Sequence, residues 1–224
     1  VLEVVEEELR LRRFAQIVRL ELFDKADPWI VDVLKQELEI GEEDIYLVKG
    51  ELDYQSLNQI AALPLPDLKY KSWTPVVPAR LSDEAVDIFS VIQRRDLLVH
   101  HPFESFSASV ERFIRQAVDD PKVMAIKMTV YRIGDDSPFI PLLIEAAEQG
   151  KQVVCVVEVK ARFDEARNLY WAEKLEKSGV HVVYGVLGYK THTKVALVVR
   201  KEQDDFRFYA HIGTGNYNSQ TAKQ

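Results

Sequence analysis

The chain has 224 residues, of which 47% are hydrophobic and 29% are charged. This composition excludes a disordered or low-complexity protein and leaves ample chain for a hydrophobic core. The single cysteine, Cys155, excludes an internal disulfide and a cysteine-based zinc site, so we expect a reducing compartment. The chain contains no apolar run long enough to cross a membrane and no signal-peptide pattern at its first residues.

The formal charge of −7 argues against a protein that handles polyanions, but the charge is unevenly distributed. Residues 1–80 carry 10 bases against 16 acids, whereas residues 121–200 carry 12 bases against 9 acids. The later part of the chain is therefore able to attract an anion locally despite the acidic total.

The first third of the chain predicts a partial α+β domain. Alternating apolar residues favour a strand over 14–22, and Asp27 followed by Pro28 is typical of a helix start, so we expect a helix that stops near Gly41. A second short helix is expected over 54–63. The prolines between residues 64 and 78 exclude regular helix and indicate a linker.

From residue 81 onward the chain predicts two helices, 82–92 with Ser82 as its cap and 106–118, and then a regular alternation. Strands are expected at 123–131, 153–159, 180–184, 192–199 and 206–211, and helices at 140–149 and 165–178. Strands that alternate with helices predict crossover units and hence an α/β fold, with a mostly parallel sheet and flanking helices.

Ligands of such sheets bind beyond the carboxyl ends of the strands, and these ends are rich in cations here. Arg132 follows the first expected strand, Arg162 the second, and Lys190 the third. Arginine grips phosphate oxygens through a fixed fork of donors, and lysine acts as a mobile point charge. The pattern predicts an anion site, and an ordinary solvated rim is the alternative for any one of these residues.

His192 is the most informative residue because Lys194 follows it at the period of a strand, which predicts that both lie on one face. A neutral imidazole nitrogen is a nucleophile near pH 7, and a neighbouring lysine holds the phosphoryl oxygens that it attacks. Taken alone, this pair also fits a structural histidine in a strand.

A glycine-rich turn follows the last expected strand and contains Gly213, Thr214, Gly215 and Asn216. Its glycines allow close approach of the backbone to a ligand, and Thr214 and Asn216 add side-chain donors. A tight turn without a ligand is the alternative interpretation.

Together the His-x-Lys pair and the Gly-Thr-x-Asn turn resemble the signature of the phospholipase D superfamily, in which histidine forms a phosphoenzyme. Val199 stands where that signature has aspartate. Longer segments are similar to polyphosphate kinase of the phosphohistidine type; they are 100–106, 126–132, 159–165, 179–185 leading into 190–194, and 213–218.

The resemblance implies a fragment of a larger enzyme. Residues 1–80 would form the C-terminal part of a middle, or head, domain, which is the partial α+β domain. Residues 81–224 would form the first phospholipase-D-like catalytic domain, truncated at its C-terminus, with a mostly parallel sheet. Functional residues of the remaining domains are absent, so we expect this chain alone to be inactive.

The resemblance also implies an activity: reversible transfer of the ATP γ-phosphate to inorganic polyphosphate through phosphohistidine at His192, with Lys194 positioning the phosphate. Lys190, Gly213, Thr214, Gly215 and Asn216 would contact phosphate or nucleotide. Arg132 and Arg162 fall on positions that the family associates with Mg²⁺. Since arginine has donors only, we interpret both as clamps on phosphate oxygens beside the metal.

Mg²⁺ is thus the expected cofactor, with ATP as substrate and ADP and polyphosphate as further ligands. The resemblance implies a homo-oligomer of cytoplasmic location, with peripheral membrane association in some members. Nucleic acid is not expected, because no basic stripe interleaved with aromatic residues appears. Two alternatives stay open: a phospholipase-D-like phosphodiesterase or nuclease that uses His192, and a non-enzymatic polyanion-binding module.

Overall fold

The computed structural model describes residues 2–11, 14–71, 73–132, 134, 137–159, 161, 164–186 and 188–223. Helix α1 (Leu2–Leu11) opens the chain. The whole chain divides into two compact units: an amino-terminal unit, Glu7–Ser72, and a sheet unit, Trp73–Gln224 together with Val1–Glu6.

The amino-terminal unit is built on one crossover. Strands β1 (Leu20–Phe23) and β2 (Ile45–Val48) pair in parallel, and α2 (Pro28–Leu38) connects them. The expected start of α2 is confirmed, because the Asp27 side chain accepts a 2.8 Å hydrogen bond from the N–H of Trp29. The strand expected over 14–22 is wrong in its first part, since only its last residues pair, and β2 was not predicted.

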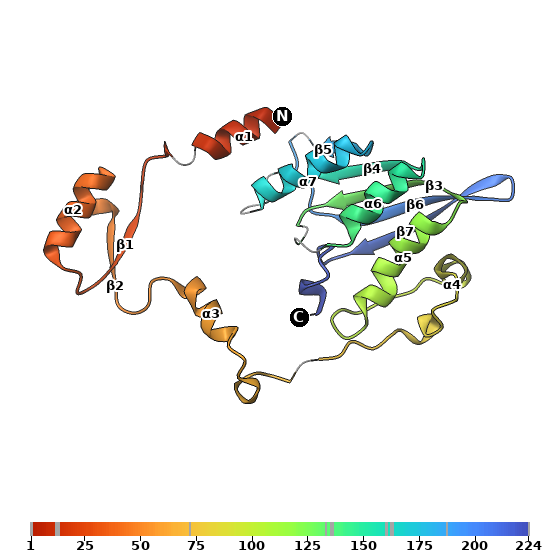
Figure 1. Ribbon diagram of the computed structural model, residues 1–224, viewed down its shortest axis with the longest axis horizontal. Helices are drawn as coiled ribbons and strands as arrows, with labels where there is room; N and C mark the ends of the chain where they lie inside the picture. Colours follow the sequence, from red (N-terminus) through yellow and green to blue (C-terminus); the bar gives the residue numbers. More distant parts are fainter. Residues whose placement is uncertain are drawn as a thin grey trace. The chain divides into compact units, whose positions relative to one another are not determined.

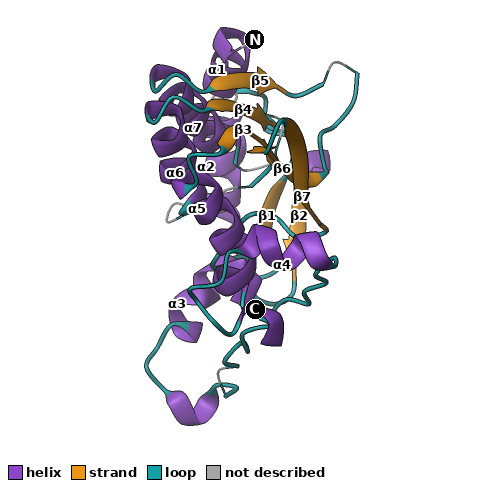
Figure 2. Cartoon of the chain, turned by 90° about the vertical axis from the view of Figure 1, so that its right-hand side faces the viewer, coloured by secondary structure: helices purple, strands orange, loops and turns teal. Residues whose placement is uncertain are grey.

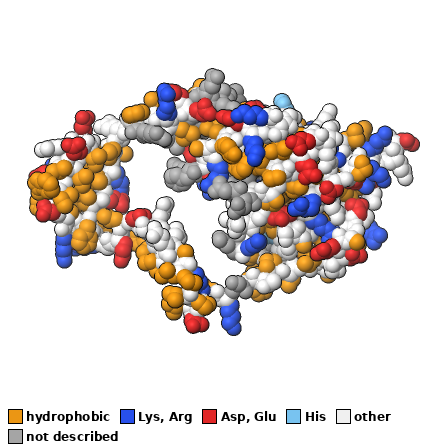
Figure 3. All heavy atoms as spheres, viewed as in Figure 1, with side chains coloured by type: hydrophobic (Ala, Val, Ile, Leu, Met, Phe, Trp, Pro, Cys, Tyr) orange, Lys and Arg blue, Asp and Glu red, His pale blue; other side chains and the backbone are white. Residues whose placement is uncertain are grey.

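Short helical turns complete this unit, including α3 (Leu57–Ala61), which lies within the helix expected over 54–63. Apolar side chains are prominent on its surface (Figure 3), and Trp29, Leu47 and Ile60 are 72%, 62% and 64% exposed. Among the described residues of the unit, Ile40 alone is a buried apolar side chain. The unit by itself therefore buries little apolar surface.

The sheet unit contains five strands in the order β5-β4-β3-β6-β7 (Figure 1). Their bounds are β3 (Val123–Val130), β4 (Gln152–Val157), β5 (His181–Tyr184), β6 (Lys194–Glu202) and β7 (Asp205–Gly213). Strands β3, β4 and β5 are parallel, whereas β6 runs antiparallel to both β3 and β7. All strands except β6 therefore point the same way, which confirms the predicted α/β class with a mostly parallel sheet.

Three helices cover one face of this sheet: α5 (Arg112–Asp119), α6 (Phe139–Glu148) and α7 (Glu165–Lys177) (Figure 2). Apolar residues of alternate strand positions meet them, as the period of a strand requires. The core includes Ile126, Met128, Val157, Ile140 and Leu143. The opposite face is only partly covered within the described residues, and Phe208 and Ile212 on β7 are 65% and 77% exposed.

Helix α4 (Ile88–Arg94) begins later than the sequence predicts. Asp87, not Ser82, is its cap, and the Asp87 side chain accepts hydrogen bonds from the N–H groups of Phe89 and Ser90. The reason lies in the preceding loop, where the Arg112 guanidinium donates hydrogen bonds to the carbonyl oxygens of residues 81, 83, 84 and 86. Those carbonyls are unavailable to a helix that starts at Ser82.

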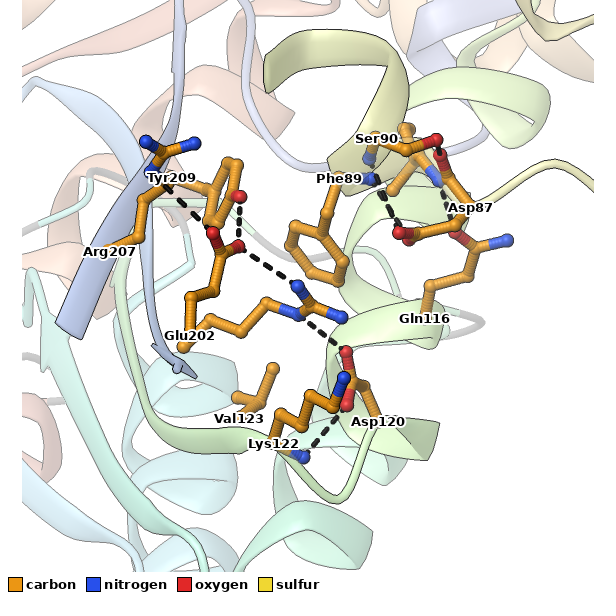
Figure 4. A network of polar contacts seen from close by, with 12 residues as sticks. Asp87, Phe89, Ser90, Gln116, Asp120, Lys122, Val123, Glu202, Arg207 and Tyr209 are labelled. Carbon is orange, nitrogen blue, oxygen red and sulfur yellow. Dashed lines mark hydrogen bonds and ion pairs between the residues drawn. The ribbon is translucent and has the colours of Figure 1, made fainter. Parts of the chain in front are cut away.

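A network of ion pairs closes the end of the sheet where β6 turns into β7 (Figure 4). The Arg200 guanidinium lies 2.7 Å from Asp120 Oδ2 and 2.9 Å from Glu202 Oε1. Tyr209 donates to the same Glu202 carboxylate. Burial opposes the charge of Asp120, but hydrogen bonds from Arg200 and the Lys122 N–H outweigh it and lower the pKa of the carboxyl. This network fixes the hairpin at the end remote from His192.

Candidate functional site

The reversed direction of β6 places the candidate residues at one edge of the sheet. The carboxyl ends of β3, β4, β5 and β7 meet the amino end of β6 there. Lys194, the first residue of β6, is the direct register partner of Gly213, the last residue of β7. The His-x-Lys pair and the glycine-rich turn are therefore neighbours across one hairpin.

The ring of Tyr131 is the centre of this edge. The His192 ring approaches it edge-on with 5.0 Å between the two centroids. Lys194 Nζ lies 5.0 Å, Lys190 Nζ 5.7 Å and Arg132 Cζ 5.6 Å from its centroid. Three cations and an imidazole therefore surround a single aromatic ring, whose negative face favours positive charge.

Lys194 is a buried cation, with 3% of its surface exposed. Its Nζ donates a 2.6 Å hydrogen bond to the carbonyl oxygen of His192. Burial, with a smaller contribution from the Arg132 guanidinium, lowers the pKa of Lys194. Among the residues that the structure describes, no carboxylate forms an ion pair with it. A buried ammonium in this state favours an incoming anion.

His192 lies outside β6, in the loop before it, and its side chain is exposed. The prediction that strand alternation aligns His192 with Lys194 is therefore wrong in its reason. The loop instead presents the imidazole to solvent, while the lysine two residues later enters the covered side of the sheet beside Ala196 and Val198. The two side chains meet at the Tyr131 ring.

Arg132 is held in place by Asp164, the residue that precedes α7. Arg132 Nε lies 3.1 Å from Asp164 Oδ2, and Arg167 Nη1 lies 3.1 Å from the other carboxylate oxygen. One carboxylate thus orients two guanidinium groups. Arg162, expected to act beside Arg132, lies outside the described residues.

The glycine-rich turn rests on His211 and Tyr217. Tyr217 is buried, and its hydroxyl is 2.9 Å from His211 Nδ1. Burial, aided by the proximity of His101, lowers the pKa of His211 to about 4, so the imidazole is neutral at pH 7. A Cβ atom added to Gly213 would lie 2.9 Å from His211 Cε1, which explains the glycine at this position.

The turn also approaches the loop that follows β3. A Cβ atom added to Gly134 would lie 3.1 Å from Asn218 Nδ2. Asn216 Oδ1 is buried and has no hydrogen-bond partner among the described residues, while Thr214 and Gly215 are exposed. The turn therefore lies close to Gly134, two residues after Arg132, and carries an acceptor without a partner among the described residues.

The described residues around His192 do not fit a metal site built from protein ligands. In the part of the chain that the structure describes, no three His, Cys, Asp or Glu side chains form a group able to hold a metal ion. The side chains nearest the Tyr131 ring are cationic, and Asp164 is engaged by two arginines. This donor set suits phosphate oxygens.

Sequence reasoning did not identify Tyr131 as part of the site. Tyr131 was visible only as the residue before Arg132, and its contacts with residues 190–194 depend on the pairing of β3 with β6.

Cys155 is buried as expected, and burial raises the pKa of its thiol to about 12. Across the described ranges, no helix is both long and apolar enough to cross a membrane.

Comparison with known proteins gives consistent results. The family model for polyphosphate kinase C-terminal domain 1 matches residues 87–224, and the model for the polyphosphate kinase middle domain matches residues 1–60. A polyphosphate kinase of Parasynechococcus marenigrum is 53% identical over 98% of this chain, and one of Streptomyces coelicolor is 48% identical over 100% of it. These alignments cover 33% and 30% of the relatives, so the chain spans about a third of their length.

A comparison with solved structures also finds a polyphosphate kinase. The crystal structure of polyphosphate kinase from Porphyromonas gingivalis matches with a TM-score of 0.69 and 29% sequence identity, over 89% of this chain and 30% of that one. A division of this chain at residue 80 stays a prediction. The model that covers residues 87–224 includes the whole edge of the sheet around Tyr131 and His192, and the chain belongs to the polyphosphate kinase family.

Proposed function

We propose that the full-length protein containing this chain transfers the γ-phosphoryl group of ATP reversibly to inorganic polyphosphate through a phosphohistidine at His192. One observation carries the proposal: an exposed imidazole lies beside a buried ammonium, that of Lys194, which has no ion-pair partner among the described residues. Such an arrangement offers a nucleophile together with a positive charge that is available to the phosphoryl group.

The transfer takes two displacements at phosphorus. The lone pair of the unprotonated ring nitrogen of His192 attacks the γ-phosphorus, the bond from that phosphorus to the bridging oxygen breaks, and ADP leaves with the electron pair. A terminal oxygen of polyphosphate then attacks the phosphohistidine, and the phosphorus–nitrogen bond breaks to restore the imidazole. Charge neutralisation by Lys194, Lys190 and Arg132 lowers both barriers, because positioning and electrostatics dominate phosphoryl transfer.

Mg²⁺ in this proposal is a companion of the ATP phosphates, since the described residues supply no carboxylate cluster for it. Arg132 and Arg162 are proposed to grip the same phosphates. Thr214, Gly215 and the half-buried Asn216 are proposed to contact phosphate or nucleotide from the neighbouring turn. ADP and polyphosphate are the other expected ligands.

The experiment is to incubate the full-length protein with ATP labelled at the γ-phosphate and to isolate the labelled peptide. We expect an acid-labile, base-stable label on the peptide containing His192, and its loss in H192A. H181A is the matched control, because His181 is an exposed histidine on β5 and should keep the label. A wild-type protein without label, or one that hydrolyses phosphodiesters instead, would refute the proposal.

Three further expectations belong to the same proposal. The 224-residue chain should not make polyphosphate by itself, because it spans only about a third of its relatives. The full-length protein should form a homo-oligomer, which light scattering measures. It should be cytoplasmic, with peripheral attachment to the membrane in a form that salt releases on cell fractionation.

A further inference from the structure

We infer that Thr129 and Glu158 are positioning residues for His192: their side chains hold the backbone on both sides of the histidine and so fix the exposed imidazole over the Tyr131 ring. This inference rests on the proposed function of His192. It concerns residues 191–195, which form the loop before β6 and the first two residues of that strand.

Thr129 replaces part of the ladder between β3 and β6. The paired register of these strands ends at Met128 and Ala196. Beyond it the Thr129 hydroxyl accepts a 3.0 Å hydrogen bond from the N–H of Val195 and donates one of 2.8 Å to the carbonyl of Thr193. A side chain therefore bridges the two strands at the place where the backbone of the loop departs from β3.

Glu158 holds the other side of the histidine. It follows β4, is 5% exposed, and its Oε2 accepts a 2.7 Å hydrogen bond from the N–H of Thr191. Its own backbone N–H is bonded to the carbonyl of Val130 at 2.9 Å. Asn168 from α7 donates to the carbonyls of both Glu158 and Tyr131, at 2.9 and 2.8 Å, which joins the ends of β3 and β4.

The backbone around His192 is thus anchored by side chains at successive points. Glu158 accepts a hydrogen bond from the N–H of Thr191, and Lys194 donates one of 2.6 Å to the carbonyl of His192. Thr129 then bonds the carbonyl of Thr193 and the N–H of Val195. A loop without ladder bonds is mobile unless other groups restrain it. A displacement of about 1 Å at a reacting group costs on the order of 100-fold in rate, so this restraint bears directly on transfer.

The test compares matched variants of the full-length protein in single-turnover phosphorylation by γ-labelled ATP. T129V removes the hydroxyl at nearly constant shape, and we expect phosphohistidine formation to slow by about 10- to 100-fold. The ATP concentration for half-maximal rate should change by less than about threefold, because the described hydrogen bonds of Thr129 go to Thr193 and Val195, which are not proposed to bind nucleotide. T129S keeps the hydroxyl and should restore the rate to within about threefold of wild type.

Glu158 requires a different pair of variants. E158Q keeps an acceptor oxygen for the Thr191 N–H and should retain most of the rate, whereas E158A should lose about 10- to 100-fold. Hydrogen exchange of the peptide over 190–196 provides a readout independent of catalysis. It should speed up in T129V and E158A and stay slow in T129S and E158Q.

Each result has a distinct meaning. Equal rates and equal exchange in T129V, T129S and the wild type would overturn the role of Thr129, and a severe loss in E158Q would show that Glu158 acts through its charge and not as a backbone anchor. A wild-type protein that acquires no label on His192 would refute the proposed function itself. In that case the exchange pattern would still report whether the two side chains restrain the loop.

Discussion

Replacing Lys194 by methionine in the full-length protein separates a catalytic charge from a structural one. The Lys194 ammonium is 3% exposed, and its lowered pKa shows that burial disfavours the charged form. Losing one donor to a developing oxyanion costs about 2.7–4 kcal/mol, or roughly 100- to 1,000-fold in rate. We therefore expect K194M to form phosphohistidine slower by that factor.

Stability should respond quite differently to this change. Removing a buried unpaired charge gains about 1–4 kcal/mol, and losing the charged hydrogen bond to the His192 carbonyl costs about 1.5–3 kcal/mol. The free energy of unfolding of the sheet unit should thus fall by no more than about 2 kcal/mol and rise by no more than about 2.5 kcal/mol. K201M, at an exposed lysine of the same strand, is the control and should leave the rate of phosphorylation unchanged.

The assay is single-turnover labelling by γ-labelled ATP combined with urea unfolding, repeated across alkaline pH. Lys194 must be protonated to act, so the wild-type rate should fall as the pH rises through a pKa below the ordinary 10.5 of lysine, and K194M should lack this decline. A wild-type rate in K194M would refute the assigned role. A loss of more than about 2 kcal/mol in unfolding free energy would show that Lys194 serves the fold instead.

Three further predictions concern the packing around the site and the opposite end of the sheet. Y131F should phosphorylate within about threefold of wild type, whereas Y131L should lose at least about 10-fold, because Lys190 and Lys194 lie within 5.7 Å of the ring centroid and phenylalanine keeps that ring; labelling rates measure both. R200M should lower the unfolding free energy by about 3 kcal/mol, since it removes the ion-pair partner of Asp120, whereas Glu202 keeps Arg207 and Tyr209. In the wild type, the pKa of Asp120 is lowered by folding, so its contribution to the free energy of unfolding is present above pH 4 and is lost as the pH falls through the folded-state pKa. Urea unfolding between pH 2 and 6 should therefore show that the free energy of unfolding depends less steeply on pH in R200M than in the wild type. G213A should cost about 1–3 kcal/mol in the same assay, because its Cβ overlaps His211, and an unchanged midpoint would contradict this packing.

Local signals predicted the helices and strands of the sheet unit well. The alternation of apolar residues located β3, β4, α6 and α7 to within about two residues at either end. The start of α4 failed because a distant side chain, Arg112, captures the carbonyls of the preceding loop. Propensity and spacing do not contain such a long-range contact.

In the candidate site, too, the residue types were predicted from the sequence, whereas the contacts between strands were not. The sequence indicated cations at the strand ends and named His192 and Lys194, because those residue types are informative by themselves. It did not predict that β6 runs antiparallel. For that reason the contact of His192 and Lys194 with the Tyr131 ring, and the pairing of Lys194 with Gly213, were not predicted either. Those relations are properties of strand pairing.

The hairpin formed by β6 and β7 also sets where this region tolerates insertions and deletions. Its turn at Gln203 and Asp204 lies at the opposite end from Lys194, so added residues there would extend the hairpin without touching the cationic edge. A single residue inserted within β6 would instead invert the faces of every side chain between the insertion and the site. Lys194 would then exchange its enclosed position for the open face of the sheet, and length changes should accordingly be confined to the turn.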